Sequence, residues 1–145
     1  MYKDTITLFN RKRIPHGDTW YAHVIHGVNL NTDKGSIIQK YGEQTADNAV
    51  LNIRYQQDGT NFLIGDLLWL PPKEWQSEPL AGITFTGGNA FDFFWVGTWP
   101  GSDVIADDDY EPTFYDYMLG HYDYVYAVNN VAILSVIPHF EVTGK

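Results

Sequence analysis

Ala49-Val50-Leu51-Asn52-Ile53-Arg54-Tyr55 is the clearest β-strand in the first half of the chain. Gln57-Asp58-Gly59 follows closely, and this composition is typical of the tight turn in a β-hairpin. Two short strands are predicted next, over residues 62–64 and 67–70. Pro71-Pro72 then ends the ladder, because proline has no N–H group to donate. This segment therefore predicts short strands joined by tight turns.

The same pattern extends toward the N-terminus. Thr5-Ile6-Thr7-Leu8-Phe9 alternates with the period of two that a half-buried strand requires. A longer strand is predicted over residues 19–30, and Gly27 marks a bulge within it. Residues 31–48 fit a loop, a short strand or a single helical turn, so their structure is left open.

The second half of the chain continues the pattern. A connection is predicted over residues 73–82, and an acidic loop over 97–111 leads into a short helix, which Asp109 would cap. The predicted helix covers 112–119, and the predicted strands cover 83–86, 90–96, 122–128 and 131–142, the last two joined by a turn at Asn129-Asn130. The fold class is therefore all-β, an antiparallel barrel or sandwich of short strands with one or two short helices.

The length of 145 residues predicts a single domain over 1–145. The chain has no cysteine, which excludes disulfides, zinc–thiolate sites and cysteine nucleophiles and is compatible with a reducing cytoplasm. The sequence shows neither a signal peptide nor an apolar run long enough to cross a membrane. We therefore expect a protein that neither enters nor spans a membrane.

Charge is divided unevenly along the chain. Residues 74–144 hold eleven Asp and Glu but no Lys or Arg, so the acidic excess behind the chain's net charge of −9 lies in this half. Nucleic-acid binding is not expected, because it needs basic residues to displace counterions. The shift in charge makes residues 73–82 a candidate sub-boundary between a small β-barrel and an acidic, aromatic-rich extension. The acidic loop suggests a contact with a basic partner protein through Asp103, Asp107, Asp108, Asp109 and Glu111.

Aromatic residues make up 16% of the chain and favour either interface anchors or a sugar-binding face. Trp75 and Trp99 are the candidates for both roles, so a carbohydrate-binding module that uses exposed Trp and Tyr is the alternative function. A glycoside hydrolase ranks below it, since no spacing singles out a pair of carboxylates. The acidic loop lacks the calcium-binding EF-hand pattern, and His23 and His26 face opposite sides of their strand. No catalytic residue, metal or cofactor is predicted.

Several motifs together resemble a known group of proteins. They are Gly17-Asp18-Thr19-Trp20-Tyr21, Trp69-Leu70-Pro71-Pro72-Lys73-Glu74-Trp75, Asp92-Phe93-Phe94-Trp95 and Ile137-Pro138-His139-Phe140-Glu141. Over nearly its whole length the chain resembles an uncharacterised family of small proteins encoded in the head–tail gene module of tailed phages and prophages of Gram-positive bacteria. The first 75 residues also resemble head-closure (head–tail adaptor) proteins, but the chain continues for about 70 residues beyond the usual end of an adaptor.

The resemblance implies a phage structural protein rather than an enzyme. It would act at the head–tail junction or in tail completion, through contacts with portal, adaptor or tail proteins. A ring-like homo-oligomer would form on assembly, first in the host cytoplasm and then in the virion. The resemblance carries over no catalytic residues, and it implies neither nucleic-acid recognition nor a membrane.

Overall fold

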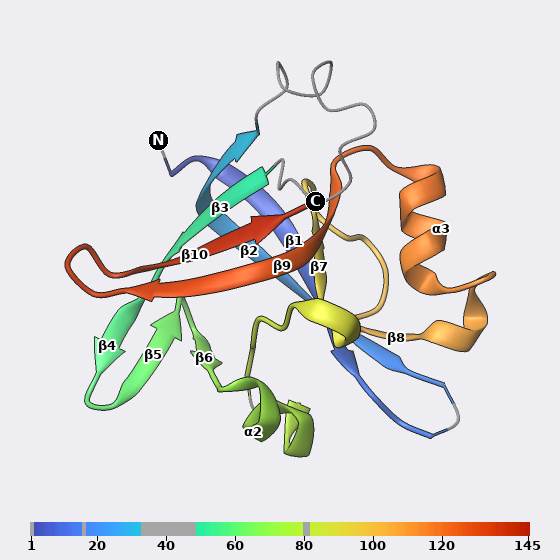
Figure 1. Ribbon diagram of the computed structural model, residues 1–145, viewed down its shortest axis with the longest axis horizontal. Coiled ribbons are helices and arrows are strands. Elements are labelled where there is room, and N and C mark those ends of the chain that lie inside the picture. The colour runs from blue at the N-terminus through green and yellow to red at the C-terminus, as the bar shows by residue number, and fades with distance from the viewer. Residues whose placement is uncertain (1, 16, 33–48, 80–81) are drawn as a thin grey trace.

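The computed structural model describes residues 2–15, 17–32, 49–79 and 82–145. Its main sheet has seven strands in the order β1-β7-β9-β10-β3-β2-β8, and β1 also pairs with β2. This additional pairing closes six of the strands into an antiparallel barrel (Figure 1). The seventh strand, β8, pairs with β2 and lies outside the closed ring. The strands are β1 (Asp4–Lys12), β2 (Thr19–Thr32), β3 (Ala49–Arg54), β7 (Phe93–Trp95), β8 (Val104–Ala106), β9 (Val125–Leu134) and β10 (His139–Gly144). The predicted β-barrel is thereby confirmed.

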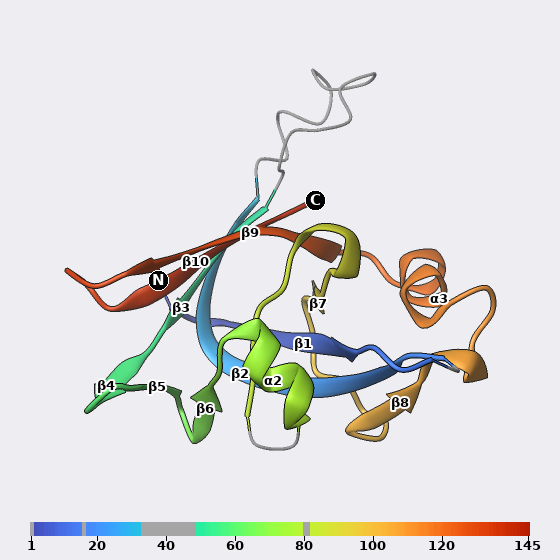
Figure 2. The ribbon, with the colours of Figure 1, turned by 60° about the horizontal axis from the view of Figure 1, so that its bottom comes forward.

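A small three-stranded sheet follows β3 and consists of β4 (Gln56–Asp58), β5 (Asn61–Ile64) and β6 (Leu67–Trp69). Two short α-helices lie outside the barrel wall, α2 (Pro72–Ser77) and α3 (Phe114–His121), as Figure 2 shows. Two 3₁₀ turns, η2 (Gly88–Ala90) and η3 (Asp107–Asp109), complete the described elements. No helix among the described residues is long and apolar enough to cross a membrane.

Side chains of the barrel wall alternate between two separate cores, because successive residues of a strand point to opposite faces. Ile6 and Leu8 of β1 face the barrel interior, where they join a cluster that includes Phe140. Phe9 faces outward and joins Trp20, Phe93, Phe114 and other residues in a second cluster. The outer cluster holds α3 and the acidic segment against the wall of the barrel.

Gly27 is the bulge residue of β2, as predicted. Its φ of 70° lies in the left-handed region, and the register with β1 shifts there, from Thr5 opposite His26 to Asp4 opposite Val28. Beyond the bulge, β2 pairs with β3 over residues 29–32. Residues 19–21 of β2 pair instead with β8. The stretch between these two pairings is where β2 and β3 diverge.

Several boundaries differ from the sequence-based expectations. The predicted turn at Asn129-Asn130 is wrong, because β9 runs through both residues and the chain turns over residues 135–138 instead. At Val128 the strand changes its main partner from β7 to β10, and a register shift beside it absorbs the bend. The connection expected over 73–82 contains α2, and the strand expected over 83–86 contributes one bridge, from Ile83 to Trp69.

The helix after the acidic loop forms with a different cap. Thr113, rather than Asp109, is its N-cap, and Thr113 Oγ1 accepts a hydrogen bond from Asp116 N at 3.1 Å. Three barrel strands, β7, β9 and β10, follow residue 82, so the candidate sub-boundary at 73–82 lies between strands of one barrel. The expectations for 33–48 fall outside the described residues.

Candidate docking site

The acidic residues of the predicted partner-binding loop divide into two groups. Asp103, Asp108, Asp109 and Glu111 are exposed. Asp107 is partly buried, and its Oδ1 accepts hydrogen bonds from Trp20 Nε1 at 2.9 Å and from Phe114 N at 3.0 Å. Asp107 therefore joins β2 to the start of α3, and the other four carboxylates remain available to a partner.

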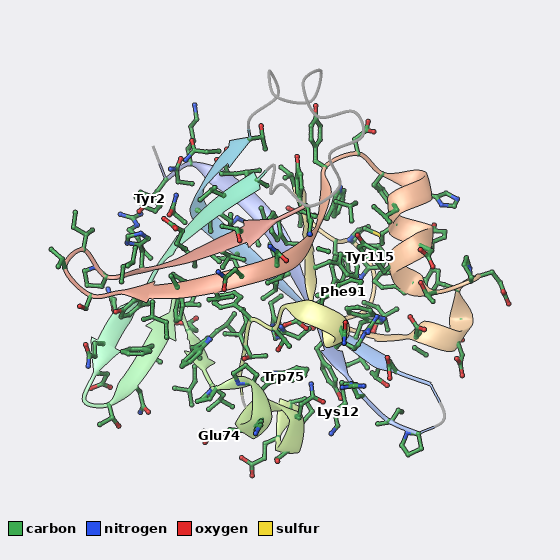
Figure 3. All side chains as sticks on the ribbon, in the orientation of Figure 1. Tyr2, Lys12, Glu74, Trp75, Phe91 and Tyr115 are labelled. Atoms are coloured by element: carbon green, nitrogen blue, oxygen red, sulfur yellow. The ribbon has the colours of Figure 1, made fainter. Side chains whose placement is uncertain are left out.

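The two tryptophans singled out from the sequence are part of the protein interior. Trp75 is fully buried, and its Nε1 donates to Gly82 O at 2.8 Å; Figure 3 shows it pointing from α2 toward the barrel. Trp99 is partly buried, with its ring 5.6 Å from that of Phe9 and 5.5 Å from that of Phe114. None of the five tryptophans is exposed. A sugar-binding face would need other residues than Trp75 and Trp99.

Two basic residues at the end of β1, Arg11 and Lys12, also make contacts within the protein. The Arg11 guanidinium lies 4.8 Å from the ring of Trp20 and 5.0 Å from that of Phe91, and its Nε lies 3.4 Å from Asp18 Oδ2. Lys12 Nζ donates to the backbone carbonyl of Gln76 in α2. These contacts fix α2 and the outer core, which explains the two basic residues without a nucleic-acid ligand.

The two most exposed large apolar side chains of the described residues, and two others, lie at the end of the β9–β10 hairpin, over residues 133–137, which we call the tip. Val136 is 96% exposed and Ile137 68%, with Ile133 and Leu134 at 44% and 39%. The hairpin projects from one side of the barrel (Figure 1). Residues 124–140, which contain the tip, include no Asp, Glu, Lys or Arg. A run of exposed, uncharged apolar residues at a hairpin turn is unusual on a surface that meets only water.

The backbone at the tip is held in place by Tyr55, the residue that follows β3. Tyr55, which is 6% exposed, donates from its hydroxyl to Leu134 O at 3.1 Å and from its backbone N to Pro138 O at 3.3 Å. His139 Nδ1 also lies 2.6 Å from Ile137 O. The apolar side chains are therefore presented on a fixed support, which lowers the entropy that a contact with a partner would cost.

An open cleft of about 1040 Å³ lies beside the tip, and we call it the β2–β3 cleft. Its walls are residues 22–28 of β2, the end of β3, the β5–β6 turn and the base of the tip at Ile137 and Pro138. His23 lines the cleft and lies opposite Leu8 in the β1–β2 pairing, so its side chain faces the barrel. Burial lowers the pKa of His23 to about 4, against an opposing effect of the Asp103 charge.

Asp92 is the most deeply buried carboxyl group among the described residues, with 1% of it exposed. It accepts hydrogen bonds from Asn10 Nδ2 at 2.9 Å, Arg11 N at 2.9 Å and Thr86 N at 2.7 Å. Burial raises its pKa to about 7, and the hydrogen bonds and the Arg11 charge oppose that rise. Asp92 thus ties the segment before β7 to β1.

Within the described part of the chain, no group of three or more His, Cys, Asp or Glu could hold a metal ion.

The feature that sequence reasoning missed is the tip. The signal was present, because residues 131–138 form an apolar run inside a longer stretch without charge. That run was predicted only as part of a strand over 131–142, and periodicity alone does not tell an exposed end from a buried one.

Comparison with known proteins identifies one family. The model of the family described as "Family of unknown function (DUF6751)" matches residues 1–145. No curated protein and no solved structure matches the chain.

Proposed function

The chain belongs to the family of unknown function DUF6751, and from the surface of the chain itself we propose a role. We propose that it is a non-enzymatic assembly protein of tailed-phage particles. It acts at the head–tail junction or in tail completion, by docking to portal, adaptor or tail proteins. It assembles in the host cytoplasm, forms a ring-like homo-oligomer and remains in the virion.

The exposed tip is the observation that carries this proposal. Burying the side chains of Val136 and Ile137, which are 96% and 68% exposed, would contribute on the order of 3 kcal/mol to an interface. An assembly protein needs such an anchor, since a few well-placed apolar side chains supply most of the binding free energy. A protein that works alone would gain only an aggregation hazard from it.

The acidic loop supports the same role in a different way. Asp108, Asp109 and Glu111 are exposed on the side of the molecule that carries α3, whereas the tip lies at the other end of the barrel (Figure 1). Asp103 is exposed too, but it lines the β2–β3 cleft beside the tip. Charged groups of one sign steer a basic neighbour and select against an acidic one. The molecule therefore offers two separate contacts, one apolar and one electrostatic, as a component between two neighbours requires.

Mass spectrometry of density-purified particles, from cells that carry the gene in its phage or prophage, tests this function. Wild-type protein should copurify at roughly six to twelve copies per particle, as for a ring around one axis. The double variant Val136→Ser/Ile137→Ser should be lost from particles. Leu119→Ser, which changes a side chain 47% exposed on α3, is the matched control and should be retained. Absence of the wild-type protein from particles would refute the proposal.

A further inference from the structure

The β2 edge that lines the cleft is not paired with another strand. Ala22 N donates to Asp103 O at 2.8 Å, so the backbone groups of Ala22 point away from β1. Backbone direction alternates along a strand, so those of Val24 and His26 point to the same side. In the described chain, no strand pairs with this edge between the β8 contact at Tyr21 and the β3 contact at Asn29. An edge of this kind accepts an added strand.

The charges around the cleft favour a neutral occupant. The charged groups in its lining are Arg54, Asp66 and Asp103, with the two histidines His23 and His26 beside them. One arginine against two aspartates leaves the lining with a net charge of only −1, which disfavours an acidic segment and gives a basic one little attraction. The apolar part of the lining includes residues of β3 and of the β5–β6 turn.

The tip has the properties that this cleft requires. It is the uncharged turn end of the β9–β10 hairpin, and its four exposed apolar side chains amount to between two and three fully exposed ones. Two copies of a chain with a net charge of −9 repel each other over most of their surface. The tip and the cleft are adjoining surfaces where two copies can approach without placing acidic groups opposite one another.

We propose that the tip of one copy occupies the β2–β3 cleft of a second copy, where its side chains cover the apolar lining and its backbone pairs with the open edge at Val24 and His26. The contact uses two different surfaces of the same chain. When it is reciprocal it gives a two-fold dimer, and when it repeats in one direction it gives a ring. The inference rests on the proposed function only in naming the tip as the docking element.

Cysteine cross-linking tests the contact directly, because the chain has no cysteine of its own. Two single-cysteine variants are mixed, Val136→Cys in the tip and Gln56→Cys, an exposed residue of the cleft lining. A short bis-maleimide should join them into a mixed dimer. Val136→Cys mixed with Leu119→Cys, on α3, should give no mixed dimer. Cross-linking of Val136→Cys to itself in preference to Gln56→Cys would mean that tips pack against tips, and it would overturn the proposal.

Sedimentation of the full chain over a range of concentrations provides the second measurement. Wild-type protein should associate, and the double variant Val136→Ser/Ile137→Ser should associate only at a concentration at least tenfold higher. Both residues are exposed, so the variant should keep the fold, and circular dichroism would verify this. A wild-type chain that stays monomeric overturns the self-contact. If the wild-type chain is monomeric but the Val136→Ser/Ile137→Ser variant is still lost from particles, the tip binds another protein. In that case the self-contact is refuted and the proposed function stands.

Discussion

Two buried titratable groups, Asp92 and His23, should make the stability of this protein depend on pH in opposite directions. Burial raises the pKa of Asp92 from its ordinary value of 3.8 to about 7. Burial lowers the pKa of His23 from 6.5 to about 4. Each difference between the folded and unfolded pKa changes the free energy of unfolding by about 1.4 kcal/mol per pH unit within its own window.

For Asp92, the folded state holds the proton more tightly than the unfolded state. Its contribution is therefore fully present below about pH 4 and is lost as pH rises to about 7, a total on the order of 4 kcal/mol. For His23, the unfolded state holds the proton more tightly. Its destabilising effect is greatest below about pH 4 and disappears as pH rises to 6.5, a total on the order of 3 kcal/mol. Between pH 4 and 6.5 the two slopes offset each other.

The assay is urea unfolding followed by tryptophan fluorescence at several pH values between 4.5 and 7.5, on wild type, Asp92→Asn and His23→Gln. Relative to wild type, Asp92→Asn should gain stability with rising pH, by about 1.4 kcal/mol per unit between pH 4.5 and 6.5. His23→Gln should show the reverse slope. Asp92→Asn should also carry a loss of about 1–3 kcal/mol at every pH, because an amide cannot accept all three hydrogen bonds from Asn10, Arg11 and Thr86.

The slopes, rather than the overall stabilities, decide the matter. If Asp92→Asn and wild type run parallel across this range, Asp92 is ionised in the folded protein. Its three N–H donors would then outweigh the effect of burial, and the reasoning about its pKa would be refuted. A parallel result for His23→Gln would refute the corresponding argument for the histidine.

Three further predictions concern the barrel and its attachments. In denaturant titrations, Phe140→Ala should lower the free energy of unfolding by about 3–5 kcal/mol, and Phe140→Leu should lower it by less. The Phe140 ring is fully buried, and its centroid lies 5.0–5.3 Å from those of Tyr55, Trp69 and Phe85. Tyr55→Phe should cost about 1 kcal/mol and speed amide hydrogen exchange in the tip, since it removes the bond to Leu134 O; unchanged exchange would contradict the support role of Tyr55. Thr113→Ala should cost about 1 kcal/mol by calorimetry, whereas Thr113→Ser should be nearly neutral, because serine keeps the capping oxygen.

Local sequence signals located most of the first half of the fold. The strand at 49–55, the Gly59 and Gly65 turns and the bulge at Gly27 were all recognisable, because alternation and glycine each report on the backbone directly. The expected strand at 83–86 failed for a nonlocal reason. Its Thr84 is buried, and the Thr84 backbone bonds to the side chain of Asn10, a partner 74 residues away, instead of to a ladder.

The site was harder to predict than the fold, because exposure is a property of the assembled chain. Trp75 and Val136 show this in opposite directions. A tryptophan beside two prolines was read as a surface anchor, but it is fully buried against Tyr21. A valine in an apolar run was predicted to lie within a strand, yet it is 96% exposed at a turn. Whether a single side chain is buried depends on which strands pack together, and a local sequence pattern does not show which strands these are.

Closure of the barrel also constrains when the protein can fold during its synthesis. β10 completes the wall by joining β3 to β9, and it ends at Gly144. A nascent chain that has reached residue 138 already exposes β1, β2, β3 and β7, with the apolar faces of the interior open to water. Long-range pairings of this kind form slowly. Until residues 139–144 have left the ribosome, the chain therefore has five of the six barrel strands but no closed barrel, and its exposed apolar faces are prone to aggregation.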